Sequence, residues 1–375
     1  MSTRRRSVRP YAGWVITTTL DIREGVALAP FTTLGIGGPA RYFVVAVTED
    51  EVVAAVAWAR ERGVKLFVLG GGSNLLVRDA GFDGLVVQMA IRGIVSCGEG
   101  CLSAGAGESW DGFVEYAVER GLAGVECLAG IPGSVGGTPV QNVGAYGQEV
   151  AETIEMVRAF DLSAGAFVEL GKAECRFRYR ESLFNTDEPG RYIVTRVRFQ
   201  LRADGLPTLK YAELRERFGL AESLDPTPVA KGRAMKVAPS LAEVAKTVRE
   251  IRLEKGMLIV EGDPDCRSAG SFFKNPVVGV EVLERVAAAA GGVEVPHWAA
   301  GEGRVKLPAA WLLERAGFVK GYGVGAAGIS MRHTLALTNR GGATCADIER
   351  LQGEIVRGVW ERFGVRLERE PVGVG

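Results

Sequence analysis

The sequence predicts an α+β protein of more than one module, and three observations support this fold class. The chain has 375 residues, more than a single hydrophobic core usually stabilises, so two or three domains are expected. Hydrophobic residues make up 47% of it and charged residues 24%, a composition typical of globular domains. Segments with helical and strand patterns alternate along the chain, and glycine-rich loops separate several of them.

The first module opens with a strand–helix–strand unit that ends in a glycine loop. Residues 40–47 are predicted to form a strand, and Thr48 with Glu51 predicts a capping box that starts a helix to about Arg62. A short apolar strand, 65–69, then runs directly into the loop. A second helix is predicted over 109–121, and further strands over 85–89, 102–104, 154–160, 166–170 and 192–201.

The second module follows a polar segment, 203–236, which contains three prolines and reads as a connection. Ser240 with Glu243 and Thr344 with Asp347 form two further capping-box patterns, which predict helices. Pro308 is expected to open a short helix. The predicted helices are 241–251, 309–316 and 345–363, and a terminal strand is predicted over 365–370. We therefore expect a flexible N-terminal extension (1–30), a first domain (31–202), a connecting segment (203–239) and a C-terminal domain (240–375).

Charge and cysteine usage exclude several classes of function. Lys plus Arg and Asp plus Glu both number 45, so no broad field points to nucleic acid or a membrane surface. The six cysteines include no Cys-x-x-Cys pair and there are only two histidines, which argues against a metal site. We expect six reduced thiols in a cytoplasmic protein. No apolar run is long enough to span a membrane, and the basic N-terminus is not followed by the apolar region of a signal peptide.

Glycine is the most informative residue type, with 51 occurrences. The loop 70–74, Gly-Gly-Gly-Ser-Asn, follows a strand and can direct several backbone N–H groups at one anion. It has neither the Walker nor the Rossmann spacing, and a tight turn without a ligand explains it nearly as well. A second loop, 130–147, is also rich in glycine, and a dinucleotide diphosphate is the common reason for two such loops in one module. A crowded turn between sheets remains the alternative.

Two further segments carry polar groups suited to chemistry. In the run 173–182, an extended chain would place Arg176, Arg178 and Arg180 on one face, where guanidinium groups suit a carboxylate or phosphate. A solvated edge strand is the alternative. The segment 268–276 combines Ser271 with a lysine, an asparagine and two phenylalanines. No histidine is nearby to activate that serine as a nucleophile, so a proton-donor role fits better, with a structural turn as the alternative.

Four motifs together resemble a known family. They are Leu69-Gly-Gly-Gly-Ser-Asn-Leu75, Asn142-Val-Gly-Ala-Tyr-Gly147, Phe177-Arg-Tyr-Arg-Glu-Ser182 and Gly270-Ser-Phe-Phe-Lys-Asn-Pro276. In this order they are similar to the UDP-N-acetylenolpyruvoylglucosamine reductase family of peptidoglycan precursor synthesis, over a span from about Phe31 to the C-terminus. The resemblance implies an FAD-binding domain of the vanillyl-alcohol-oxidase type followed by an α+β substrate domain.

The resemblance also implies a reaction and three catalytic residues. NADPH reduces non-covalently bound FAD, and hydride then passes to the enolpyruvyl double bond of the UDP-sugar, with both substrates using one cleft. Ser271 is expected to give the proton to the carbon next to the carboxylate, Arg180 to bind that carboxylate, and Glu370 to be the acidic partner near the C-terminus. Because Pro371 follows Glu370 where the family usually has Glu-Val, Glu368 is a competitor for the acid role.

The remaining expected contacts follow from motif positions. Tyr211 stands where one branch of the family carries a substrate-loop tyrosine. The other expected substrate contacts are Tyr179, Lys255, Lys274, Asn275, Lys306 and His333. Expected cofactor contacts are Gly70, Gly71, Gly72, Ser73, Asn74, Leu75, Gly130, Ile131, Gly133, Ser134, Gly137, Asn142, Gly144, Ala145 and Tyr146.

Two other classes of function remain open. One is a different flavin oxidoreductase on the same fold, many of which attach FAD through a histidine in the first module. This chain has no histidine before His297, which favours the reductase. The other is a non-catalytic nucleotide-binding protein that has kept the loops, which the presence of Ser271, Arg180 and Glu370 disfavours.

Overall fold

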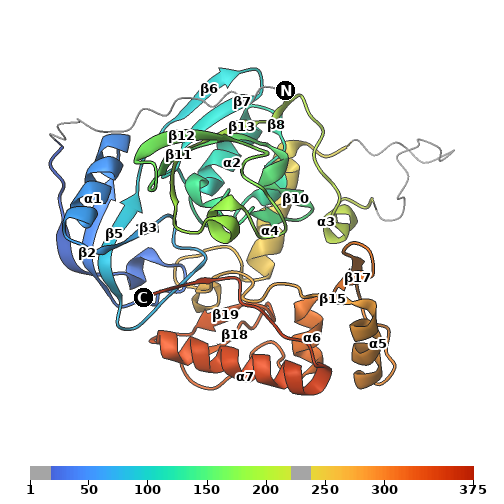
Figure 1. Cartoon of the computed structure of the whole chain (residues 1–375). Helices are drawn as coiled ribbons and strands as arrows, with labels where there is room; N and C mark the ends of the chain where they lie inside the picture. Colours follow the sequence, from blue (N-terminus) through green and yellow to red (C-terminus); the bar gives the residue numbers. More distant parts are fainter. Residues whose placement is uncertain (1–17, 221–237) are drawn as a thin grey trace. The chain divides into compact units, whose positions relative to one another are not determined.

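The computed structural model describes residues 18–220 and 238–375, and helices and strands alternate along them (Figure 1). The chain divides into two compact units, each made of separate stretches of sequence. Unit 1 comprises Met1–Arg23, Phe43–Gly71 and Leu85–Ile251, and unit 2 comprises Glu24–Tyr42, Gly72–Gly84 and Arg252–Gly375. The mixed helix and strand content confirms the α+β class, whereas the domain boundaries expected from the sequence stay a prediction.

A five-stranded antiparallel sheet with the order β12-β11-β13-β7-β6 lies in unit 1. Its strands are β6 (Ile94–Gly98), β7 (Cys101–Gly105), β11 (Ile154–Asp161), β12 (Ala166–Gly171) and β13 (Tyr192–Gln200). Helix α2 (Trp110–Glu119) packs on this sheet through aromatic rings, since Phe113 lies 4.5 Å and Trp110 5.9 Å from Phe199 of β13. These elements confirm the strands and the helix that the alternation of apolar residues predicts.

A second sheet has the order β1-β2-β5-β3. Its strands are β1 (Arg23–Ala27), β2 (Pro39–Ala46), β3 (Lys65–Leu69) and β5 (Phe82–Met89). Helix α1 (Glu49–Glu61) lies against β3, and its predicted capping box is present. The Glu51 N–H donates to Thr48 Oγ1, and the Thr48 N–H donates to a Glu51 carboxylate oxygen, both at 3.2 Å. The helix ends before Gly63, whose φ of +62° suits only glycine without strain.

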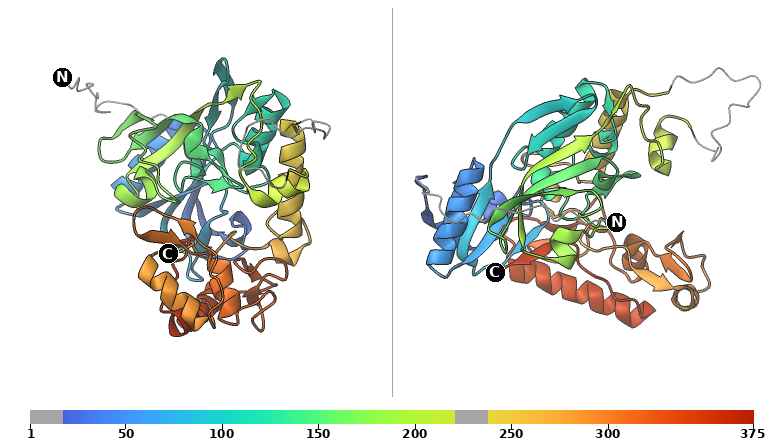
Figure 2. Two further views of the ribbon diagram at one scale, coloured as in Figure 1. Left: turned by 90° about the vertical axis from the view of Figure 1, so that its right-hand side faces the viewer. Right: turned by 45° about the horizontal axis from the view of Figure 1, so that its top comes forward.

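Further elements complete unit 1, and the left view of Figure 2 shows helix α4 along its length. They are β8 (Leu122–Ala123), β9 (Gly144–Ala145), β10 (Gln148–Glu149), β14 (Arg202–Ala203), α3 (Ala212–Arg217) and α4 (Leu241–Glu254). The capping box predicted for α4 is present, because the Glu243 N–H donates to Ser240 Oγ and the Ser240 N–H donates to the Glu243 carboxylate. Part of the predicted connecting segment, residues 221–237, lies outside the described residues.

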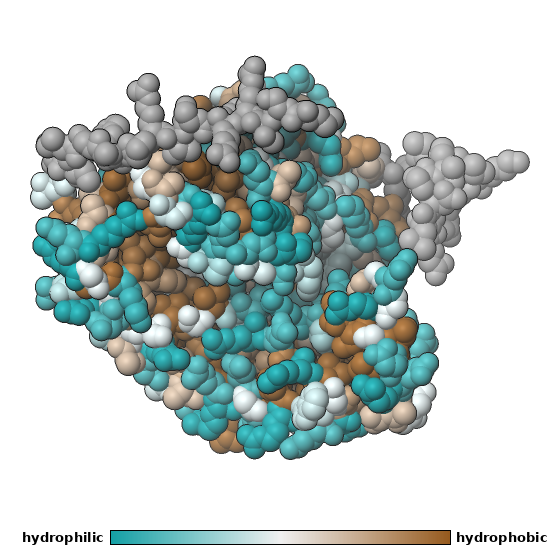
Figure 3. Space-filling model, viewed as in Figure 1, coloured by the Kyte–Doolittle hydropathy of each residue, from teal (hydrophilic) through white to brown (hydrophobic). Residues whose placement is uncertain are grey.

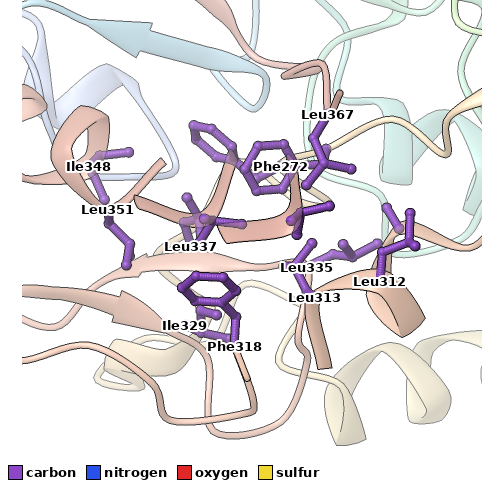
Figure 4. Close-up of a cluster of buried hydrophobic side chains, with 14 of the residues drawn as sticks. Phe272, Leu312, Leu313, Phe318, Ile329, Leu335, Leu337, Ile348, Leu351 and Leu367 are labelled. Carbon is purple, nitrogen blue, oxygen red and sulfur yellow. The ribbon is translucent and has the colours of Figure 1, made fainter. Parts of the chain in front are cut away.

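Unit 2 is built around one hydrophobic cluster (Figure 4). Helix α7 (Cys345–Phe363) contributes Ile348, Leu351 and Ile355 at helical spacing, and it packs on the strand pair β18–β19. Phe272 and Phe273 are both buried in the same cluster. The remaining elements are β4 (Leu75–Val77), β15 (Val277–Gly279), α5 (Val280–Ala289), β16 (Trp298–Ala299), β17 (Arg304–Lys306), α6 (Ala309–Arg315), β18 (Ala327–Ile329), β19 (Leu337–Asn339) and β20 (Val372–Val374).

The predicted terminal strand is wrong in its limits. The terminal strand is β20, which pairs in parallel with β4, whereas 365–370 makes only a single bridge, between Arg369 and Phe273. Pairing with β4 is non-local, so the alternation of 365–370 gave no signal of it. The expected extension 1–30 contains strand β1, and its residues 1–17 lie outside the described residues.

The expectation of six reduced thiols is also wrong. Cys97 and Cys101 form a disulfide across the turn between β6 and β7, with Cα atoms 5.1 Å apart. Gly98 and Gly100 have positive φ angles, which let the turn close tightly. The other four cysteines are buried and free, and burial raises the pKa of the Cys175 thiol to about 12.

Among the described residues, no helix combines the length and the apolar character needed to cross a membrane. The face drawn in Figure 3 carries hydrophilic residues interspersed with hydrophobic ones. Within residues 18–220 and 238–375, no group of three or more His, Cys, Asp or Glu side chains is arranged to hold a metal ion.

Candidate active site

The two glycine loops expected from the sequence touch each other within unit 1. A Cβ added to Gly71 would lie 2.4 Å from the Gly133 Cα, and one added to Gly70 would lie 2.7 Å from Ser134 Oγ. Real Cβ atoms do not approach other atoms so closely, so only glycine fits where the loops meet. The loops thus form one cradle of exposed backbone, which we call the glycine cradle (residues 70–71 and 130–134).

Ser134 is the polar group of this cradle. Its residue is 8% exposed, and its Oγ is buried with no hydrogen-bond partner among the described residues. A buried hydroxyl without a partner is costly, and a bound ligand or ion that accepts its hydrogen bond is one explanation for it. Together with neighbouring backbone amides, this hydroxyl suits the oxygen atoms of a diphosphate. The cradle therefore fits the diphosphate of a dinucleotide such as FAD.

The Gly130 N–H donates a hydrogen bond within the protein. Its N–H donates to Asp111 Oδ1 at 2.6 Å, and the same carboxylate accepts from Arg249 Nη2 of α4 at 2.8 Å. Asp111 and Arg249 thus fix the start of the second loop. Sequence reasoning did not identify either residue, because their partners are distant along the chain.

The Asn142 side chain is also hydrogen-bonded within the protein. It is 1% exposed, and its Nδ2 donates to the Glu149 carboxylate and to the Arg178 carbonyl, each at 3.0 Å. Its Oδ1 accepts from the Ala151 N–H at 3.2 Å. The side chain therefore joins the second glycine loop to the arginine segment, which brings two of the sequence motifs together.

The arginine segment is a turn, so the expected common face of three arginines is wrong. Arg178 and Glu181 exchange backbone hydrogen bonds of 2.9 and 3.2 Å around Tyr179 and Arg180. Arg178 pairs with the Glu181 and Asp187 carboxylates, and Arg176 also approaches Asp187. Alternation along a strand does not apply, because Arg176 and Arg180 have φ angles of +48° and +59°.

The Arg180 guanidinium donates to backbone carbonyls of the second glycine loop. Its Nη2 donates to the Gly144 carbonyl at 2.5 Å, and its Nη1 lies 3.4 Å from the Asn142 carbonyl. Two carbonyls from the second glycine loop therefore orient the guanidinium. Among the described residues, five non-glycine residues have positive φ, and four of them, Asn142, Tyr146, Arg176 and Arg180, lie in these two segments. Strain of this kind gathers at functional sites.

The serine segment pairs with the end of the chain inside unit 2. The Glu370 N–H donates to the Phe272 carbonyl, and the Lys274 N–H donates to the Glu368 carbonyl, both at 2.9 Å. The pairing holds Glu370 beside the residue that follows Ser271. Ser271 and Glu370 are half-buried, whereas Glu368 is exposed.

Asn74 of the first glycine loop secures this arrangement from the same unit. Its carbonyl accepts from the Val372 N–H at 2.9 Å, and its Nδ2 lies 3.3 Å from the Glu370 carbonyl. Asn74 therefore helps to position the C-terminal segment through backbone contacts.

His333, one of the expected substrate contacts in unit 2, has a neutral side chain that can donate a hydrogen bond. Its Nδ1 accepts from the Leu335 N–H at 3.0 Å, which leaves the proton on Nε2. Burial, together with the positive charges of Lys255, Lys320 and Arg252, lowers the pKa of His333 to about 4. Lys255 and His333 therefore belong to one basic neighbourhood.

Three other expected substrate contacts, Asn275, Lys306 and Tyr211, each contact a neighbouring residue in the structure. Asn275 Oδ1 accepts from the Ala309 N–H at the start of α6, and Lys306 lies over the Trp298 ring at 5.7 Å. In unit 1, the Tyr211 ring meets the Tyr146 ring edge-on at 5.2 Å.

Family models match two parts of the chain. The FAD binding domain model matches residues 40–171, and the model described as UDP-N-acetylenolpyruvoylglucosamine reductase, C-terminal domain, matches residues 263–374. The first match and the glycine cradle define the class, a flavoprotein with an FAD-binding domain, and they confirm the fold class expected from the sequence.

Relatives and a solved structure identify the family. The UDP-N-acetylenolpyruvoylglucosamine reductase of Streptomyces coelicolor is 51% identical over 355 residues, which are 93% of this chain and 89% of that protein. The enzyme of Thermobifida fusca is 45% identical over 95% of this chain and 99% of its own length. The crystal structure of the Thermus caldophilus reductase has a TM-score of 0.63 and 28% identity, covering 95% of this chain and 99% of that one. The chain belongs to the UDP-N-acetylenolpyruvoylglucosamine reductase family.

Proposed function

We propose that this protein reduces the enolpyruvyl ether of UDP-N-acetylglucosamine to UDP-N-acetylmuramate, with NADPH as reductant and FAD as carrier. The 51% identity to a reductase over 93% of the chain carries this proposal. Bound FAD supplies the chemistry of accepting hydride from NADPH and delivering it to the substrate double bond. We infer that the enzyme works in the cytoplasm, in peptidoglycan precursor synthesis, where NADPH and nucleotide sugars are available.

We assign FAD binding to the glycine cradle. The unpartnered hydroxyl of Ser134 and the close approach of Gly71 to Gly133 support this assignment. Non-covalent binding is expected, because the chain has no histidine before His297.

We assign the substrate carboxylate to Arg180. Hydride addition to the terminal carbon of the double bond leaves charge on the neighbouring carbon and its carboxylate. A guanidinium held in place by the Gly144 carbonyl can stabilise that charge bidentately. A preorganised donor of this kind lowers the activation free energy by several kcal/mol.

We assign proton delivery to Ser271, with Glu370 as its acidic partner. The Ser271 hydroxyl gives its proton to the carbon next to the carboxylate, which completes the addition of hydride and proton across the double bond. A serine hydroxyl is a weak acid, so it needs the strongly basic carbanion as acceptor. The exposure of Glu368, compared with the half-buried Glu370, favours Glu370 in the acid role.

The test is a two-step flavin experiment on the purified protein. NADPH should bleach the yellow flavin, and the enolpyruvyl UDP-sugar should restore the colour with one UDP-N-acetylmuramate formed per cycle. If NADPH and the sugar share one cleft, steady-state lines should be parallel in double-reciprocal plots. Bleaching without reoxidation by the sugar would instead indicate another flavin oxidoreductase of the same fold, and a protein that takes up no FAD would refute the proposal.

A further inference from the structure

Glu126 is a buried carboxylate that the proposed reaction does not use. It is 0% exposed, and it accepts three hydrogen bonds of 2.7 Å. The donors are the Gly124 N–H, the Thr208 N–H and Gln148 Nε2, and all three are neutral amides. A buried carboxylate persists only when such donors replace water, and bonds to a charged acceptor are roughly twice as strong as neutral ones.

The three donors come from separate segments of unit 1. Gly124 lies two residues before Glu126, Gln148 begins β10 just after the second glycine loop, and Thr208 lies three residues before Tyr211. Gln148 adds two more links, because its Oε1 accepts from the Cys127 N–H at 2.8 Å and its Nε2 lies 3.0 Å from Thr208 Oγ1. The carboxylate is thus the shared acceptor of a network that joins residues 208–211 to the end of the glycine loop.

The two joined segments carry an aromatic pair at their surface. Tyr146 precedes Gly147, and a Cβ on Gly147 would lie 2.7 Å from the Lys210 Cβ, so the segments touch directly. The Tyr146 and Tyr211 rings meet edge-on at 5.2 Å, and Tyr211 is 39% exposed. A small shift of residues 208–211 would therefore separate the two rings.

We propose that Glu126 is a positioning residue that sets the affinity for the nucleotide sugar by holding Tyr211 against Tyr146. It acts through Thr208 and Gln148 and does not touch the substrate. The inference rests on the proposed function and on the expectation, drawn from the family resemblance, that Tyr211 contacts the UDP-sugar.

The substitution Glu126→Gln tests this role with little change of shape. One acceptor oxygen becomes an NH₂ group facing N–H donors, so at least one network bond is lost. We expect KM for the UDP-sugar to rise about 10-fold, because a change of this size corresponds to the loss of one hydrogen bond to a charged group. FAD content, flavin reduction by NADPH and kcat should stay within about twofold, because the glycine cradle is separate from this network.

The matched control is Asp161→Asn. Asp161 is also a buried carboxylate of unit 1, at 3% exposure, and it accepts from Ser163 and Arg191 at the end of β11. Its variant should leave KM unchanged. An unchanged KM in Glu126→Gln, or an equal rise in both variants, would overturn the proposal.

A milder variant keeps the test decisive if Glu126→Gln does not fold. Thr208→Val removes only the hydroxyl acceptor of Gln148 and leaves the Thr208 N–H on Glu126. We expect a rise in KM of about threefold with kcat unchanged, and no rise would count against the network. Failure of the proposed function would look different, because the unaltered protein would not turn over the sugar at all.

Discussion

The Glu370 N–H donates to the Phe272 carbonyl at 2.9 Å, which fixes the end of the chain beside Ser271. The bridge between Phe273 and Arg369 continues the same pairing. Since Phe272 and Phe273 are both buried in the core of unit 2, the pairing is anchored on its apolar side. Within this pairing Glu370 is half-buried, whereas Glu368, two residues before it, is exposed.

Glu370→Gln should therefore lower kcat strongly, by about 10²-fold, if the carboxylate takes part in proton transfer. Glu368→Gln is the matched control, because Glu368 is exposed and only its carbonyl contributes to the pairing. It should stay within about twofold of the unaltered protein. The reverse result would transfer the acid role to Glu368.

Ser271→Ala should separate the two halves of the reaction. NADPH should still reduce the flavin at the normal rate, because the serine belongs only to the step that consumes the sugar. Reoxidation by the enolpyruvyl UDP-sugar should fall by about 10³-fold, within the range for loss of a proton donor. Stopped-flow absorbance of the flavin measures both steps, and normal reoxidation would refute the assignment.

Arg180→Lys should lower kcat/KM for the sugar by about 30-fold, because a lysine keeps the charge but loses the bidentate fork. FAD content should not change. Arg178→Ala is the control, since Arg178 is paired with the exposed carboxylates of Glu181 and Asp187, and surface pairs contribute little. Equal losses in both variants would make the arginine segment structural rather than catalytic.

Gly71→Ala should impair FAD binding. The new Cβ would lie 2.4 Å from Gly133 Cα and 2.8 Å from the Ser134 nitrogen, and backbone atoms cannot move aside cheaply. We expect FAD affinity to fall at least about 10-fold, measured by flavin fluorescence during titration of the apoprotein. Gly353→Ala is the control, because nothing lies within 4 Å of a Cβ there. It should stabilise helix α7 by about 0.5–1 kcal/mol without changing FAD affinity.

Stability should fall on mild acidification because of His333. Its pKa is lowered to about 4 in the folded protein, so below its ordinary value the unfolded chain binds more protons. The contribution of neutral His333 to the free energy of unfolding is complete above about pH 6.5 and is lost as the pH falls towards 4. About 2 kcal/mol of this free energy is lost by pH 5. His333→Asn can keep the acceptor for the Leu335 N–H and should remove this part of the pH dependence in urea unfolding. An unchanged dependence would assign it to other groups.

Local features of this protein were predictable because their interactions span few residues. The capping boxes at Thr48, Ser240 and Thr344 each involve a partner three residues away, and all three are present. The strands around Phe199 and the helix of Phe113 follow from alternation and helical spacing. Motif resemblance also identified the family, because motifs are local strings.

The features that were wrong or missed depend on how the chain folds back on itself, which the local pattern does not encode. Alternation suggested an extended run through Arg178, but the segment is a turn in which Arg178 pairs with Asp187 and its carbonyl accepts from Asn142. Cys97 and Cys101 pair because a hairpin folds back between them. Glu126 had one signal, a lone charge inside the apolar stretch 122–131, but its partners were not visible in it.

By itself, then, the sequence determined the helices, most strands, the glycine loops and the family, because short-range spacing and composition control them. Only the tertiary structure decided which of these segments touch. It set Gly71 against Gly133, Glu370 beside Phe272, and the donors of three segments around Glu126. The physical reason is that hydrogen bonds and close packing between distant segments depend on the path of the whole backbone, which no single segment encodes.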